Sequence, residues 1–230
     1  MAPLARLRLA RAGLWLLCLT PLALLAERLL HGRLGANPIE FLERSLGDWS
    51  LRFLLLALAM TPLRALTGWV WPLKLRRTVG LWAYAYVCLH FAVYLVFDLN
   101  ILEPARALLQ LGDDLVKRLY ISVGFTAWLL LLPLAITSTD GWQRRLKRRW
   151  KILHRLVYPA AVFGVLHYVW LVKKDLSEPL IYAAVLALLL VWRLPWGGAW
   201  TRIRARMGGG ILRARSPAAD PRDPSFKPRA

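Results

Sequence analysis

Three histidines lie within or beside long apolar stretches of this 230-residue chain. His90 lies in the uncharged run 78–97, and His154 and His167 lie thirteen positions apart in the stretch 148–174. Ionisable side chains at membrane depth are costly, rare and usually functional. Neutral imidazoles that face one another across a helix bundle are the groups that a haem iron needs. The histidines therefore predict a membrane cytochrome that moves electrons across a bilayer.

The depth of each histidine decides which two of them can share one iron. With helices that start at residues 78 and 152 and run in the same direction, a rise of about 1.5 Å per residue puts His90 about 18 Å deep, His167 about 22 Å deep and His154 only about 3 Å deep. His90 and His167 are therefore the predicted axial pair. For His154 two roles stay open: it serves a second haem, or it lines a flavin or quinone site near the inner face.

Composition places the chain among membrane proteins. Hydrophobic residues make up 58% of it and twelve residues are Trp, which is too apolar for an ordinary soluble domain. The formal net charge of +19 would suit a nucleic-acid-binding protein. The basic residues, however, come in short clusters between apolar runs, as in loops beside an anionic lipid leaflet. We therefore expect contact with membrane lipid and none with nucleic acid.

The apolar runs predict an all-α polytopic protein, a bundle of six transmembrane helices with haem between them. The predicted spans are 12–26, 49–71, 78–97, 119–139, 148–174 and 179–192. Pro38 is predicted to open a short amphipathic helix before the second span, and the mixed segment 98–117 is predicted to lie on the membrane surface.

Charge gives the predicted orientation. With the N-terminus inside, the cytoplasmic segments hold 22 Lys and Arg residues and the opposite side holds 9. This asymmetry favours six helices with both chain ends in the cytoplasm. The predicted organisation is a cytoplasmic N-terminus (1–11), a six-helix membrane domain (12–195) and a basic, disordered cytoplasmic tail (196–230).

Two pairs of arginines flank the inner ends of the helices that carry the histidines. Arg76 and Arg77 precede the third span, and Arg148 and Arg149 open the fifth. Their main predicted role is to set the topology. A second predicted role is to hold anionic groups of a cofactor, such as a flavin phosphate.

Three motifs together resemble the MsrQ family, formerly YedZ, of the ferric-reductase-like transmembrane superfamily. The motifs are GANPIEFLERSLGDW (35–49), KLRRTVGLWAYAYVCLH (74–90) and WKILHRLVYPAAVFGVLHYVWLVK (150–173). The similarity covers most of residues 10–195.

The resemblance implies a six-helix protein of the bacterial inner membrane that binds haem b, with FMN as a further family cofactor. It places haem-associated histidines at His90, His154 and His167. It also implies a periplasmic partner, the molybdenum-cofactor enzyme MsrP, which reduces methionine sulfoxide in oxidised proteins. The chain carries no GxGxxG motif, so its electrons are expected from a separate donor, either the quinone pool or a cytoplasmic flavin reductase. We expect an electron-transfer subunit rather than the catalytic subunit.

Two alternative functions remain open at this stage. A stand-alone member of the same superfamily would reduce metal ions or quinones at the outer face without an MsrP partner. A small proton-coupled transporter would use the histidines as a proton relay. The transporter would be colourless, whereas a cytochrome absorbs visible light.

Overall fold

The computed structural model describes residues 3–172 and 175–194, and the regular elements of this part of the chain are all helices. The tail predicted at 196–230 lies outside the described residues. Contacts divide the chain after Trp192, and the helices described below all belong to the first unit.

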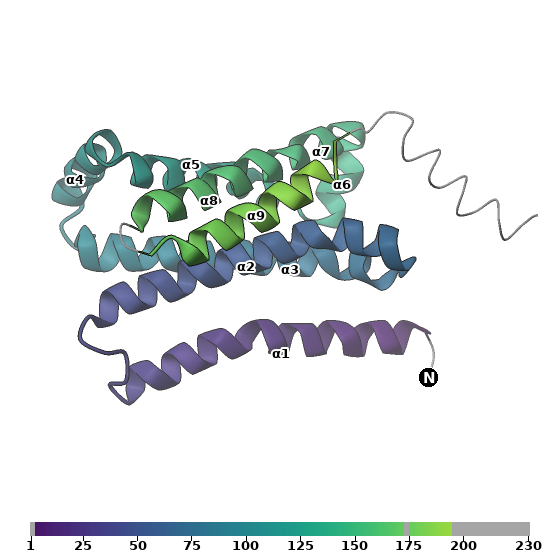
Figure 1. The fold of residues 1–230 in the computed structure, drawn as a ribbon, viewed down its shortest axis with the longest axis horizontal. Helices are drawn as coiled ribbons and strands as arrows, with labels where there is room; N and C mark the ends of the chain where they lie inside the picture. Colours follow the sequence, from purple (N-terminus) through teal and green to yellow (C-terminus); the bar gives the residue numbers. More distant parts are fainter. Residues whose placement is uncertain (1–2, 173–174, 195–230) are drawn as a thin grey trace, which may run out of the picture. The chain divides into compact units, whose positions relative to one another are not determined.

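Five helical segments are long and apolar enough to cross a membrane, and a shorter apolar helix follows them. The five are α1 (Pro3–Leu30), α2 (Pro38–Thr67), α3 (Trp71–Val93) with the π-helical turn η1 (Tyr94–Asp98), α5 (Leu119–Ile136), and the run α7 (Arg148–Leu153), η2 (His154–Leu156) and α8 (Val157–Leu171). The shorter helix is α9 (Ser177–Val191), and two connecting helices are α4 (Pro104–Lys117) and α6 (Asp140–Leu146) (Figure 1). This arrangement confirms the predicted all-α fold of a polytopic membrane protein.

Helix α2 is longer than predicted. Instead of a short helix followed by a separate span from residue 49, one unbroken helix runs for 30 residues. Its start is fixed by Asn37, whose side chain accepts a hydrogen bond from the Glu40 N–H, and by a proline at the first helical position. Its end is fixed by Gly68 in the left-handed conformation, with φ of 74°. Pro62 lies inside α2 and cannot donate a backbone hydrogen bond, but the helix continues through it. The amphipathic start therefore runs on into the span without a separate helix.

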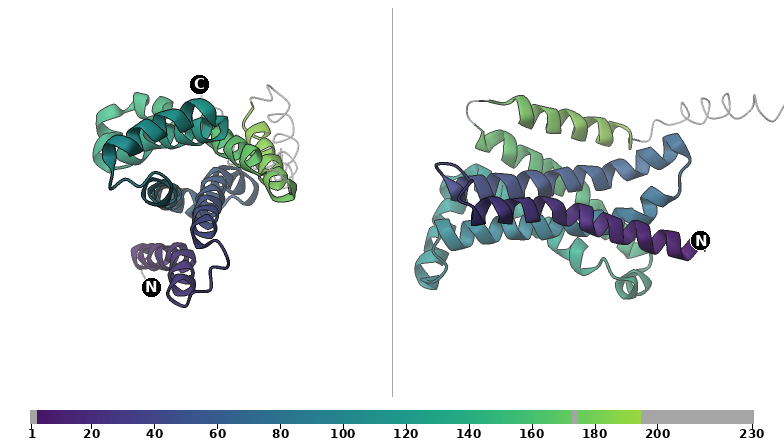
Figure 2. Two further views of the ribbon diagram at one scale, coloured as in Figure 1. Left: turned by 90° about the vertical axis from the view of Figure 1, so that its left-hand side faces the viewer. Right: turned by 90° about the horizontal axis from the view of Figure 1, so that it is seen from below.

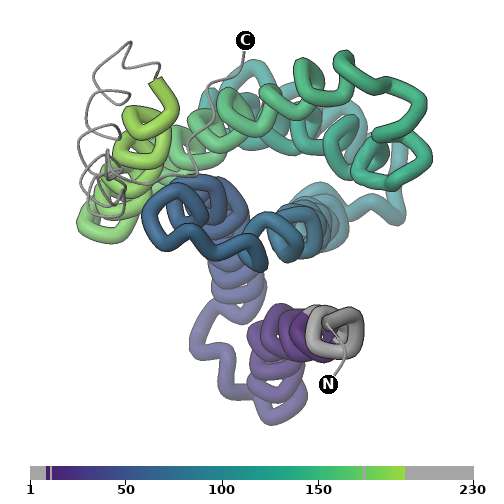
Figure 3. The backbone as a smooth tube through the Cα atoms, turned by 90° about the vertical axis from the view of Figure 1, so that its right-hand side faces the viewer, coloured from purple at the N-terminus to yellow at the C-terminus, as the bar shows by residue number. Residues whose placement is uncertain are grey.

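The helices form two closely packed pairs. The most extensive contacts are those of α2 with α3 and of α5 with α8, and α9 lies against α8 and α2. Figures 2 and 3 show α1 on one side of the α2–α3 pair, with α5, α8 and α9 on the other. Half of the apolar window of α2 is buried inside the protein, a larger share than in the other candidate spans. Helix α2 is therefore central in this part of the chain.

A tyrosine of α3 links α1 to the α2–α3 pair through hydrogen bonds. The fully buried hydroxyl of Tyr86 donates to the Cys18 carbonyl at 2.8 Å and accepts from the Leu22 N–H at 3.1 Å. These two backbone groups are four residues apart, the separation of hydrogen-bond partners in an α-helix. Pro21 lies inside this turn. The hydroxyl bridges the helix at its proline and ties it to α3.

The fifth span is interrupted between its two histidines. A short 3-10 turn, η2, contains His154 and separates α7 from α8. Pro159 follows in the first turn of α8, and its ring would clash with a carbonyl one turn earlier in a regular α-helix. The tighter turn relieves that clash. The change of helix phase therefore lies in the turn before the proline.

Candidate functional site

Helices α3 and α8 bring two of the predicted site residues together. The imidazole rings of His90 and His167 face one another with their centres 6.2 Å apart and their planes at 77°. Both side chains are turned into the protein, between the α2–α3 pair and the α5–α8 pair. The two histidines that the depth argument selected therefore lie at the same level and are in reach of one metal ion.

Each ring is oriented by a backbone carbonyl. Nδ1 of His90 lies 2.9 Å from the Glu43 oxygen on α2, and Nδ1 of His167 lies 2.7 Å from the Tyr120 oxygen on α5. A carbonyl oxygen can only accept, so each Nδ1 must carry the proton. This leaves the lone pair on Nε2, and metal-binding histidines are commonly oriented by such a second partner. Both rings are thus in the tautomer that binds a metal through Nε2.

The spacing of the rings fits an iron with two axial imidazoles. With metal–nitrogen bonds of about 2.0 Å and about 1.1 Å from each nitrogen to its ring centre, opposed imidazoles on one iron have centres about 6.2 Å apart. The observed distance has this value. His90 and His167 are therefore the residues that would hold a haem iron between α3 and α8.

Two glycines that the sequence analysis missed lie against these rings. A Cβ atom at Gly47 would lie 3.4 Å from Nδ1 of His90, and one at Gly124 would lie 2.6 Å from Nδ1 of His167. Each glycine is four residues after the carbonyl that holds the ring. A sequence signal for them existed, because each glycine precedes its histidine by 43 residues.

Aromatic side chains line the contact between α3 and α5 beside this pair. Phe91 packs on Trp128 and Phe125 with ring centres 4.9 and 5.7 Å apart. The Trp128 indole N–H points at the Cys88 sulfur at 3.4 Å. These rings make the contact between α3 and α5 apolar.

His154 does not belong to the facing pair. Its ring stacks on Trp150 with centres 3.8 Å apart, and its Nδ1 lies 3.1 Å from the Trp150 carbonyl. Its Nε2 is buried without a well-formed hydrogen bond, although the Leu134 backbone lies close enough to interact with the ring. Arg76 is near enough to interact with it electrostatically. The structure therefore places a buried, weakly hydrogen-bonded nitrogen of His154 near a cation.

The two candidate arginine pairs lie in different surroundings. Arg76 donates to Thr61 of α2 at 3.3 Å, and Arg77 forms an ion pair with Asp140 of α6. The other pair, Arg148 and Arg149, lines an open hollow of about 470 Å³ between α6 and α7.

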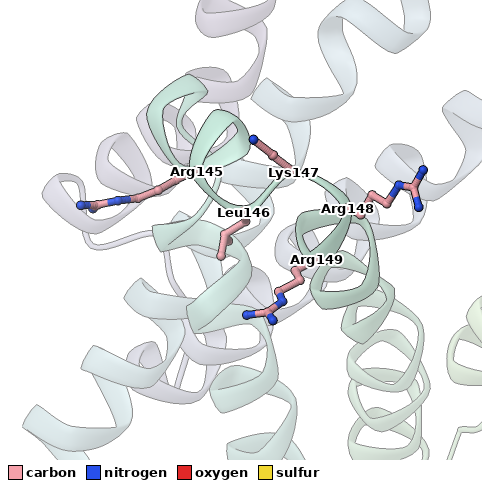
Figure 4. Close-up of a pocket in the computed structure, with 5 residues that line it drawn as sticks. All are labelled: Arg145, Leu146, Lys147, Arg148 and Arg149. Atoms are coloured by element: carbon pink, nitrogen blue, oxygen red, sulfur yellow. The ribbon is translucent and has the colours of Figure 1, made fainter.

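Figure 4 shows the full lining of this hollow, which consists of Arg145, Leu146, Lys147, Arg148 and Arg149. The guanidinium groups point in different directions around the turn. The hollow is strongly cationic, but its side chains do not converge on one point.

Comparison with known proteins places the chain in a family. Residues 46–165 match the ferric reductase like transmembrane component. The protein-methionine-sulfoxide reductase heme-binding subunit MsrQ of Rhodospirillum rubrum is 55% identical over 188 residues, covering 81% of this chain and 88% of that protein. The subunits of the same name from Xanthomonas euvesicatoria and Xanthomonas oryzae are 49% identical over 189 residues, with 82% of each chain covered. The match to the family model includes His90 and ends two positions before His167. At this level of identity and coverage, the chain belongs to the MsrQ family.

Proposed function

We propose that this protein is the haem b-binding, electron-transfer subunit of a methionine-sulfoxide reductase system, with His90 and His167 as the two axial ligands. The observation that carries the proposal is the 6.2 Å separation of two rings whose Nδ1 atoms are both held by carbonyls. The relatives are named as heme-binding subunits of this reductase, which supports the same assignment.

A bound haem would supply reversible one-electron chemistry. The protein's part is to fill both axial positions and to keep both rings still. Glu43 and Tyr120 hold the imidazoles through backbone atoms, which cannot rotate as side chains do. His90 and His167 would together supply two nitrogen ligands to the iron, which would suit the site to pass electrons on rather than to react with a substrate itself.

Electrons would leave toward a periplasmic MsrP-like molybdoenzyme, which uses them to reduce methionine sulfoxide in oxidised proteins. The name of the relatives as subunits supports the existence of such a partner. The donor would be the quinone pool or a cytoplasmic flavin reductase. The chain would lie in the bacterial inner membrane with both ends in the cytoplasm, as the excess of Lys and Arg on that side favours.

A second carrier would operate nearer the cytoplasmic face. His154 is the proposed residue, because its Nε2 is buried without a well-formed hydrogen bond. FMN is the proposed further cofactor, and the hollow beside Arg148 and Arg149 is its candidate place because it concentrates positive charge where a phosphate would bind. Arg77 is the weaker candidate, since Asp140 already pairs with it, and Arg76 is near His154.

An absorption spectrum of the purified protein, with haem and flavin quantified per chain, tests the proposal. A Soret band and α and β bands that sharpen on reduction are expected. Addition of the oxidised periplasmic molybdoenzyme with a methionine-sulfoxide peptide should reoxidise the reduced haem, and the peptide alone should not. A colourless protein would favour the proton-coupled transporter, and reoxidation by ferric ions or quinones alone would favour a stand-alone reductase.

A further inference from the structure

The two haem-ligand sites have the same internal spacing. His90 follows the residue whose carbonyl holds it by 47 positions, and so does His167. Each histidine also follows the glycine against its ring by 43 positions. A shift of 77 residues therefore carries all three parts of the first site onto the second, from Glu43, Gly47 and His90 to Tyr120, Gly124 and His167.

The same shift of 77 positions also aligns the residue ranges of the helices. Moved by 77 positions, α3 (Trp71–Val93) becomes 148–170, which coincides with the run from Arg148 to Leu171. Moved likewise, α2 becomes 115–144 and contains α5. Around the ligands the residues correspond as well: Leu-His-Phe at 89–91 becomes Leu-His-Tyr at 166–168. The most extensive helix contacts are also equivalent, α2 with α3 and α5 with α8.

We propose that α2–α3 and α5–α8 are two copies of one haem half-site, in which Gly47 and Gly124 are positioning residues for the iron ligands. This inference rests on the proposed function of His90 and His167. Because α3 and α8 run in the same direction (Figure 1), the two copies are parallel repeats, and their imidazoles meet with ring centres 6.2 Å apart.

The role of the glycines follows from what surrounds them. A glycine in a membrane helix usually lets another helix backbone approach closely. Here, the three atoms nearest to a Cβ at Gly124 all belong to the His167 ring, at 2.6, 3.0 and 3.0 Å, and those nearest to a Cβ at Gly47 all belong to the His90 ring, at 3.4 to 4.0 Å. The missing side chain makes room for the imidazole rather than for a helix. Each ring can then approach the helix closely and reach the carbonyl one turn earlier.

The two copies differ in how tightly the ring is held. At 2.6 Å, a methyl group at Gly124 overlaps the His167 ring, so the ring or α5 must move. At 3.4 Å, a methyl group at Gly47 needs a shift of only a few tenths of an ångström. The second copy is therefore the more sensitive one.

The repeat fails at the inner end of the helices. The shift of 77 residues pairs His154 with Arg77, which cannot ligate iron and forms an ion pair with Asp140. The duplicated unit thus provides two imidazoles at the outer level and one at the inner level.

Alanine substitutions at four glycines in the full-length protein test the inference. Gly124→Ala should weaken haem binding by roughly 10- to 100-fold, the usual cost of disturbing a residue that orients a metal ligand. Haem that remains should bind carbon monoxide after reduction, because the displaced His167 no longer fills its axial position. Gly47→Ala should keep its haem and show a smaller shift of the Soret band.

Two matched controls separate positioning from general helix stability. A Cβ at Gly164 would meet only Leu51 at an ordinary 3.6 Å, and one at Gly80 would meet nothing within 4 Å. Gly164→Ala and Gly80→Ala should keep the wild-type spectrum and should not bind carbon monoxide. If Gly124→Ala matches these controls while His167→Ala loses haem, the inference is wrong and the proposed function stands. If His167→Ala keeps all its haem, the proposed function itself is wrong.

A second experiment tests the role of Gly124 if the Gly124→Ala variant does not fold. In His167→Gly, added imidazole should enter the vacated space and restore the six-coordinate spectrum. In His167→Gly combined with Gly124→Ala, the new methyl group would occupy that space, and restoration should need roughly 10-fold more imidazole or fail. Equal restoration in both variants would overturn the role of Gly124.

Discussion

His90 and His167 lie 77 residues apart in the chain, yet their imidazole rings face one another with centres 6.2 Å apart. His90→Ala and His167→Ala should each abolish or strongly deplete bound haem, because one remaining axial ligand makes a weak, five-coordinate site. The haem-to-protein ratio of the purified variants, taken from a pyridine haemochrome assay, measures the effect.

His31 supplies the control for this pair. It lies at the end of α1, its side chain is 62% exposed, and it interacts only with Glu27 of its own helix in the part of the chain that the structure describes. His31→Ala should leave haem content and spectrum unchanged. Full retention of haem in His90→Ala or in His167→Ala would rule out the proposed pairing.

His154 lies apart from the facing pair, stacked on Trp150. His154→Ala should therefore leave the haem between His90 and His167 bound but slow its reduction by a donor that acts from the cytoplasmic side. Stopped-flow absorbance with such a donor measures the rate. Dithionite bypasses the route and should reduce wild type and variant equally.

Two results would contradict this role for His154. Loss of all haem would make His154 a ligand or a scaffold of the main site. An unchanged rate of haem reduction by the cytoplasmic donor would show that His154 takes no part in electron transfer to the haem.

The predicted orientation places α3 and the run from Arg148 to Leu171 parallel, both from the cytoplasm outward. Reporter fusions after Arg77 and after Arg149 should report the cytoplasm, and fusions near Gly35 and Gly112 should report the exterior. The enzymatic activity of paired reporters that work on opposite sides of the membrane gives the result. A cytoplasmic signal at Gly112 would reverse the third span and overturn the depth argument.

The hydroxyl of Tyr86 is the polar link between α3 and the proline turn of α1. Tyr86→Phe should lower the free energy of unfolding by about 1 kcal/mol, because the Cys18 carbonyl and the Leu22 N–H each lose a hydrogen-bond partner. Thermal loss of the far-ultraviolet circular dichroism signal in detergent provides the measurement. Tyr84→Phe is the control, since the Tyr84 hydroxyl interacts with the Cys88 thiol, a weak partner. An equal loss of thermal stability in the two variants would show that the hydrogen bonds from Tyr86 to α1 do not stabilise the protein.

The sequence alone predicted where the membrane helices lie and which histidines share a level. Both properties depend only on position along the chain. An apolar run of about 20 residues is long enough to span a membrane as a helix, and the rise per residue converts a position in that helix into a depth. His90 and His167 could therefore be paired without any knowledge of helix packing. Their role as iron ligands remains a prediction.

Rotation about the helix axes and local breaks in the helices were decided only by the tertiary structure. The carbonyls of Glu43 and Tyr120 hold the rings because α2 and α5 present one particular face to α3 and α8, and no pattern of hydrophobicity specifies a single backbone atom. The 3-10 turn at His154 likewise results from a clash with a proline that depends on three-dimensional geometry. Gly124 became recognisable as part of the site only when the ring of His167 was found in the space that a side chain would fill.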